Sequence, residues 1–103
     1  MRAISHGDLI LAARAVRGLP VARRPELLAR MLEEAHVADR YRKRLGRAHP
    51  RWGNGSLMAR AMAEPLAPEG WPDAEALEAL AQVIAAVRLW RARGFSAPRP
   101  SPM

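Results

Sequence analysis

Two groups of residues have types and spacings that could support catalysis, and the first is a Glu-x-x-His pair. Glu33 and His36 stand three residues apart, as in half of the ligand set of a di-iron carboxylate site in a helical bundle. Such a site needs a second Glu-x-x-His pair and two further glutamates, and the sequence has no second pair. Helical spacing also places both residues on the polar side of their helix. The sequence therefore argues against a di-iron site, and we expect neither a metal nor a cofactor.

Ser56 and His49 are the second group, because they are a nucleophile and a base from one ordered region. Their surroundings lack the strand-turn-helix context of a nucleophile elbow, and the spacing shows no supporting carboxylate. The backbone amides of Gly53-Asn54-Gly55-Ser56 could bind an anion at a helix start, with Arg51 assisting. The lysine and the spacing of a phosphate-binding P-loop are missing. A structural turn is the favoured interpretation, and we expect no enzymatic activity.

A basic cluster precedes this turn and supplies the candidate binding residues. Residues 1–52 hold 12 Arg or Lys against 5 Asp or Glu, whereas residues 53–103 hold 5 of each, so the net charge of +7 lies in the first half. Basic side chains recur at i, i+3, i+4 and i+7 on the polar side of one predicted helix. The candidate partner- or anion-binding residues are Arg40, Arg42, Lys43, Arg44, Arg47, Arg51 and Asn54.

Three interpretations of this cluster stay open. It is a binding surface for an anionic partner, an ordinary solvated helix face, or a product of a GC-rich genome, which Lys43 as the only lysine supports. Arg42 differs from the others because it projects on the apolar side of the helix. It either extends to water or reaches into the following loop, where it could hold a carbonyl or a ligand carboxylate.

The loop at 49–56 is predicted to be a rigid corner around which the helices are arranged. Its structural residues are His49, Trp52, Gly53, Gly55 and Ser56. We expect Trp52 to be anchored inward, so that its truncation to alanine would cost about 3 kcal/mol or more. The glycines permit a tight turn, and Ser56 or Asn54 caps the next helix.

Apolar periodicity predicts an all-α fold, a small bundle of about four helices around this central Gly/Asn/Trp loop. Two helices are long, at 25–45 and 73–93, and two are short, at 5–18 and 56–63. Ser5 and Asp8 form a weak capping box, Pro25 begins the second helix and Gly46 ends it. The last helix carries Leu77, Leu80, Ile84 and Val87 at a/d spacing, which would also allow a homodimer.

Length and composition limit the remaining possibilities. The 103 residues predict one domain at 1–94, followed by a disordered Pro-rich tail at 95–103. The absence of cysteine excludes disulfides and thiolate metal sites. No signal peptide and no apolar segment of about 20 residues is recognisable, so we expect a cytoplasmic protein without a membrane partner.

Two kinds of partner are compatible with these features. Another protein is favoured, because Ile10, Leu11 and Leu89 fall outside the predicted core faces and could contact a partner. Nucleic acid is the alternative, through the cluster from Arg40 to Arg51, although no helix-turn-helix motif is present.

The stretch His-Pro-Arg-Trp-Gly-Asn-Gly-Ser-Leu at 49–57, together with the arginine-rich helix end before it, resembles short uncharacterised proteins of Rhodobacter-like alphaproteobacteria. The resemblance extends across most of the helical region and implies a bacterial origin. It implies no activity, ligand or catalytic residue.

Overall fold

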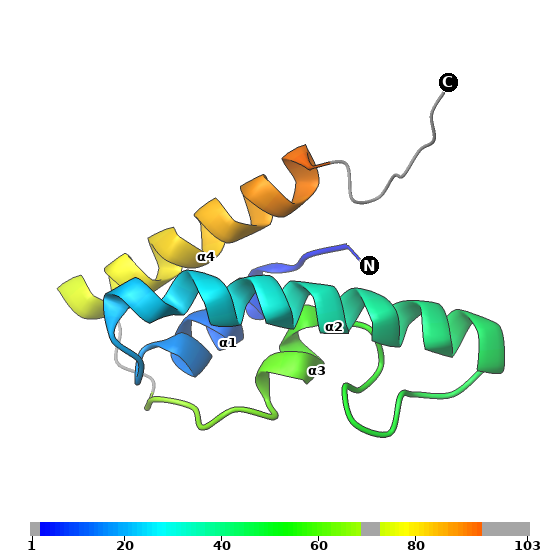
Figure 1. The fold of residues 1–103 in the computed structure, drawn as a ribbon. Coiled ribbons are helices and arrows are strands. Elements are labelled where there is room, and N and C mark those ends of the chain that lie inside the picture. The colour runs from blue at the N-terminus through cyan, green and yellow to red at the C-terminus, as the bar shows by residue number, and fades with distance from the viewer. Residues whose placement is uncertain (1–2, 69–72, 94–103) are drawn as a thin grey trace.

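Four α-helices and one short 3₁₀ helix form the computed structural model, which describes residues 3–68 and 73–93 (Figure 1). The elements are α1 (His6–Val16), η1 (Val21–Arg23), α2 (Arg24–Leu45), α3 (Leu57–Ala61) and α4 (Ala74–Ala92). The described residues contain no strand, only an isolated bridge between His49 and Gly53. The predicted all-α bundle of two long and two short helices is confirmed, with helix ends that agree to within two residues. The predicted disordered tail at 95–103 lies outside the described residues.

Side-chain caps explain where the helices begin. The Asp8 carboxylate accepts a hydrogen bond from the Ser5 amide at 2.7 Å, and the Ser5 hydroxyl accepts one from the Asp8 amide at 3.2 Å, so the predicted capping box is present. Asp73 caps α4 by accepting from the Ala76 amide at 2.7 Å. Gly46 ends α2 in the left-handed conformation, with φ at 75°, as its position after the last apolar residue predicts.

The core lies where α1 and α2 meet α3 and α4. Its fully buried large side chains are Val16, Leu28, Met31, Leu32, Leu57 and Val83. Alanines fill the contacts between them, among them Ala12, Ala61 and Ala79. Small side chains let helix backbones approach closely, which compensates for the scarcity of large apolar residues in this chain.

Buried charged side chains join the helices to one another, and the apolar pattern did not indicate them. Besides capping α1, Asp8 accepts a hydrogen bond from the Met58 amide at 2.7 Å, so one carboxylate serves the first turns of both α1 and α3. Arg24 donates to the carbonyls of Arg17 and Leu19 at 3.2 and 3.0 Å and to Gln82 of α4 at 3.1 Å. These bonds fix the end of α1 against α2 and α4.

Arg60 makes a third buried connection, between α3 and α2. Its Nε donates to the Glu34 carboxylate at 2.6 Å, and its Nη1 lies 2.9 Å from the Glu64 carboxylate. A buried guanidinium needs such partners, because an isolated buried charge is costly. The short α3 is therefore held by a cap at one end and by an ion pair at the other.

Candidate functional site

Most of the net charge lies at one end of the bundle. We call residues 39–56, the C-terminal turns of α2 and the loop after it, the basic end. It contains six basic side chains and one carboxylate, so it carries a formal charge of +5 out of +7 for the chain. The basic side chains are Arg40, Arg42, Lys43, Arg44, Arg47 and Arg51. All except Arg42 are exposed, and α2 extends past the other helices at this end (Figure 1).

The loop of the basic end folds back along α2 and packs against it at Gly55. A Cβ at this glycine would lie 2.6 Å from the Cα of Asp39, so the loop backbone rests directly on the α2 backbone. Gly55 also has φ at 99°, which side-chain-bearing residues rarely adopt. Asp39 is buried beneath this contact, and its carboxylate pairs with Lys43 at 3.1 Å. The glycine therefore fixes the position of the loop, as its assignment to the structural loop predicts.

His49 organises the turn at the tip of the loop. Its backbone exchanges two hydrogen bonds with Gly53, at 2.8 and 3.2 Å. Its Nδ1 accepts from the amides of Arg51 and Trp52 at 3.1 and 3.2 Å, so the neutral ring carries its proton on Nε2. This hydrogen bonding explains why the loop carries a histidine at this position.

Trp52 stacks on the His49 ring, with centroids 4.6 Å apart and planes at 5°. Tyr41, from α2, makes an edge-on contact with the same imidazole, with ring centroids 4.8 Å apart. The expectation that Trp52 is anchored inside the bundle is wrong, because it is only half-buried and packs on this histidine. The His49 ring provides the aromatic surface on which Trp52 packs, and the pattern of apolar residues in the sequence does not indicate this contact.

The Ser56 hydroxyl and the His49 ring both serve the backbone. Ser56 Oγ accepts from the Ala59 amide at 3.1 Å and caps α3, and Asn54 Oδ1 accepts from the Ser56 amide at 3.0 Å. Ser56 rather than Asn54 is therefore the cap residue. The arrangement gives each polar group of the turn a role in fixing the loop.

His36, from the Glu-x-x-His pair, lies at the surface of the bundle and not in a cluster of metal-ligating side chains. Its ring meets the edge of Trp90 at a centroid distance of 6.1 Å, and burial, with the Arg40 charge acting in the same direction, lowers the pKa of His36. In residues 3–68 and 73–93, no group of three or more His, Asp and Glu side chains is placed to hold a metal ion.

Arg42 is half-buried, in contrast to the exposed basic residues Arg40, Lys43 and Arg44 around it. Its Nε is buried and makes no hydrogen bond with the described residues. The helical position expected on the apolar side of α2 accounts for this burial.

A shallow cleft of about 460 Å³ opens beside the exposed arginines. Its lining residues are Val37, Arg40, Tyr41, Arg44 and Leu45. Val37 and Leu45 are exposed. Leu45 is exposed because α2 continues beyond the end of the bundle, where no helix covers it. Val37 could have been recognised in the sequence as an aliphatic residue beside the basic stripe.

No helix in the described part of the chain is both long and apolar enough to cross a bilayer.

The chain belongs to a family of proteins defined by a domain of unknown function (DUF7742), whose model matches residues 2–87. No curated protein and no solved structure shows significant similarity to it.

Proposed function

We propose that this member of the DUF7742 family is a non-enzymatic interaction module that binds an acidic, amphipathic segment of another protein. The basic end is the binding surface. The observation that carries the proposal is the composition of its cleft, in which the exposed aliphatic side chains of Val37 and Leu45 lie among Arg40 and Arg44.

The charge of this end selects an anionic partner. Five exposed cations, three in the last turns of α2 and two in the loop after it, create a positive potential that attracts carboxylates and speeds their encounter. Arginine is well suited to this role, because its planar guanidinium binds a carboxylate through two parallel hydrogen bonds. The remainder of the chain carries only +2 and would contribute little to such attraction.

The aliphatic side chains favour protein over nucleic acid. Phosphate groups gain nothing from Val37 and Leu45, whereas a peptide could bury apolar side chains against them at about 25 cal/mol per Å². An amphipathic helix that lies in a groove presents side chains at i, i+3 and i+4, a spacing that suits a short cleft along α2. Acidic residues on the same peptide would then face Arg40 and Arg44.

Fluorescence anisotropy with three labelled probes tests this proposal. The first is a 15-residue peptide with Glu and Leu at helical spacing, the second replaces each Leu with Ser, and the third is a single-stranded oligonucleotide of equal charge. We expect the first peptide to bind most tightly. Both the charge variant R40E/R44E and the apolar variant V37S/L45S should weaken its binding, whereas the control R88E, an exposed arginine on α4, should not.

Equal binding of the two peptides, or full binding by V37S/L45S, would contradict the proposed function. In that case the cleft contributes only charge.

Nucleic acid is the second candidate, supported by the six basic side chains and the adjacent aromatic residues. Trp52 and His49 already stack on each other, which leaves less aromatic surface for bases. Mobility-shift assays over a salt series would measure the counterions released on binding. The absence of any shift at about 50 mM salt, where phosphate contacts are strongest, would exclude this candidate.

A further inference from the structure

Helix α4 has few polar side chains for a helix on the outside of the bundle. Of its residues, only Glu75, Glu78, Gln82, Arg88 and Arg91 are polar. Here the bundle buries one side, at Ala76, Ala79 and Val83, and the opposite side is open.

Large aliphatic side chains lie on the open side of α4. Leu77, Ile84 and Leu89 are 50%, 42% and 56% exposed. Of the four residues predicted at a/d spacing, Leu80 and Val87 therefore face the bundle. The other two, Leu77 and Ile84, face away from it. Scattered exposed aliphatic side chains are ordinary, but here three lie on one outer helix together with the exposed Ala81 and Ala85.

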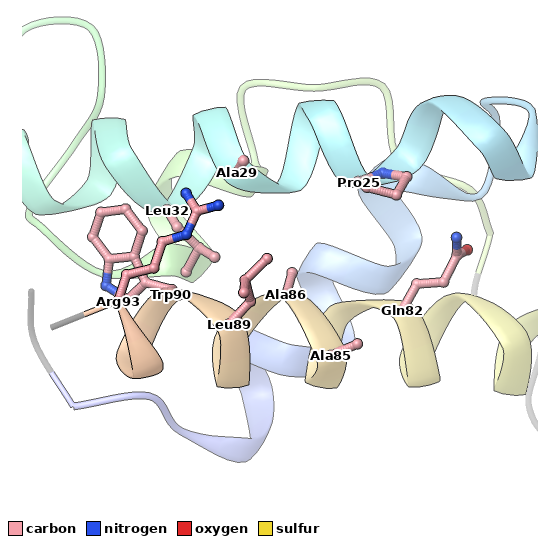
Figure 2. Close-up of a pocket in the computed structure, with 9 residues that line it drawn as sticks. All are labelled: Pro25, Ala29, Leu32, Gln82, Ala85, Ala86, Leu89, Trp90 and Arg93. Carbon is pink, nitrogen blue, oxygen red and sulfur yellow. The ribbon is translucent and has the colours of Figure 1, made fainter. Parts of the chain in front are cut away.

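A shallow apolar groove of about 200 Å³ continues this surface toward α2 (Figure 2). Pro25, Ala29 and Leu32 form its α2 wall. Ala86 and Leu89 face them from α4. Because Leu89 lines the groove and is also exposed, the groove and the outer face of α4 form one surface. We call the outer face together with this groove the α4 face.

We propose that the α4 face binds a second copy of this chain, with the two α4 helices antiparallel about a two-fold axis near the middle of the helix. The charges along α4 indicate this occupant. Its acidic residues, Glu75 and Glu78, lie in the first half, and its basic residues, Arg88 and Arg91, lie in the second half.

Antiparallel pairing places the acidic half of one copy beside the basic half of the other, and it also opposes the two helix dipoles. Parallel pairing would place like charges together. Arg17 of the same chain already binds Glu75 at 3.0 Å, so Glu78 is the main acidic contribution to the intermolecular match.

Small side chains occupy the centre of the α4 face. Ala81 and Ala85 are exposed and lie on either side of Val83, the midpoint of the helix. A two-fold axis brings each central residue close to its own copy, and alanine allows the helix axes to approach to about 8 Å. Leu77 and Ile84 then border the contact on one side and Leu89 on the other. The interface does not depend on the proposed function of the basic end.

Sedimentation velocity of the full chain over a concentration series tests the dimer. We expect a species of twice the 11.4 kDa chain mass that dissociates on dilution. I84E should shift the dissociation constant at least tenfold toward monomer. The matched control is M62E, which places the same charge on an exposed methionine outside the α4 face, and it should dimerise like the wild type. Circular dichroism would establish that both variants are folded.

The antiparallel arrangement has its own tests. E78R should weaken the dimer by placing two basic regions together, and the double variant E78R/R88E should restore it. Because the chain has no native cysteine, single cysteines report orientation directly. A mixture of Ala74→Cys and Ala92→Cys proteins should form a mixed disulfide on mild oxidation. Cross-linking of Ala74→Cys to itself in preference to this would overturn the antiparallel arrangement.

A wild-type chain that stays monomeric up to about 1 mM, the weak limit of specific association, would overturn the dimer itself. An I84E variant that dimerises as well as the wild type would place the interface elsewhere and would overturn the proposed face.

Discussion

Among the glycines that the structure describes, Gly55 should be the one whose replacement by alanine destabilises the fold most. Two effects add at this position. Alanine at φ 99° costs about 1 to 2 kcal/mol, because its Cβ crowds its own backbone. The new methyl group would also lie 2.6 Å from the Cα of Asp39 and 2.8 Å from its Cβ, where carbon atoms normally stay about 3.5 Å or more apart.

The second effect is severe because neither partner can yield easily. Asp39 lies within α2, and the atom nearest to the new methyl group belongs to the helix backbone. The loop must therefore move off α2, which costs about 1 to 3 kcal/mol as in other overpacked sites. The total of about 2 to 5 kcal/mol is a large share of the stability of a small domain. It should lower Tm by about 10 to 30 °C.

Two glycines of the same chain are matched controls. Gly46 also has a positive φ, at 75°, but an added Cβ would meet nothing within 4 Å, so Gly46→Ala should cost only the backbone term of about 1 to 2 kcal/mol. Gly18 has neither constraint, and Gly18→Ala should be neutral or stabilising by up to about 1 kcal/mol. Thermal and urea denaturation followed by circular dichroism would measure all three. If Gly55→Ala unfolds like Gly46→Ala, the loop does not rest on α2 and the description of the basic end is wrong.

Three further predictions concern single side chains. Asp8→Ala should cost about 2 to 4 kcal/mol in urea unfolding, because α1 and α3 each lose a hydrogen-bonded first turn; a loss below about 1 kcal/mol would mean that the shared cap is not formed. Trp52→Ala should cost only about 1 to 2 kcal/mol, since the ring is half-buried and loses mainly its stacking on His49; a loss of about 3 kcal/mol or more would restore the expectation of full burial. The pKa of His36 is lower in the folded chain, so near this pKa the unfolded chain binds more protons than the folded one, and stability should fall as pH decreases through about 6.5, the unfolded value. His36→Gln should reduce this dependence of stability on pH in unfolding curves from pH 8 to 5, and an unchanged dependence would exclude His36 as its source.

Local signals in the sequence were sufficient for the helices. Caps and breakers act within a few residues, so Ser5, Pro25 and Gly46 could be assigned without knowledge of the tertiary fold. The exposed arginine stripe followed from the same helical period. These features make the fold class and the position of the basic end predictable.

Contacts between distant residues were not predictable in this way. Asp8 is a local cap in the sequence, and nothing near it indicates that it also binds the Met58 amide 50 residues away. Nothing near Arg24 or Arg60 in the sequence indicates that these charged residues are buried. Both are buried because carbonyls and carboxylates from other elements surround them. Burial of a charged residue depends on its partners, which only the three-dimensional arrangement supplies.

The error at Trp52 has the same origin and affects the interpretation of the whole loop. A large aromatic residue among glycines predicts an anchor in the core, but a histidine whose Nδ1 binds two loop amides already fixes the turn. Trp52 then needs only to cover that histidine, and part of its surface stays exposed.

The contacts that hold the loop of the basic end in place would also favour binding of a partner. Exposed arginines on a flexible segment would lose much conformational freedom when they bind a partner, which reduces affinity. Here Arg40 and Arg44 project from a helix, and the loop beneath that helix is fixed by Gly55 and by the stack on His49. The backbone would therefore already be ordered when the proposed partner binds. Gly55→Ala should for this reason weaken peptide binding as well as stability, even at temperatures where the variant is fully folded, and unchanged binding would show that the loop does not support the cleft.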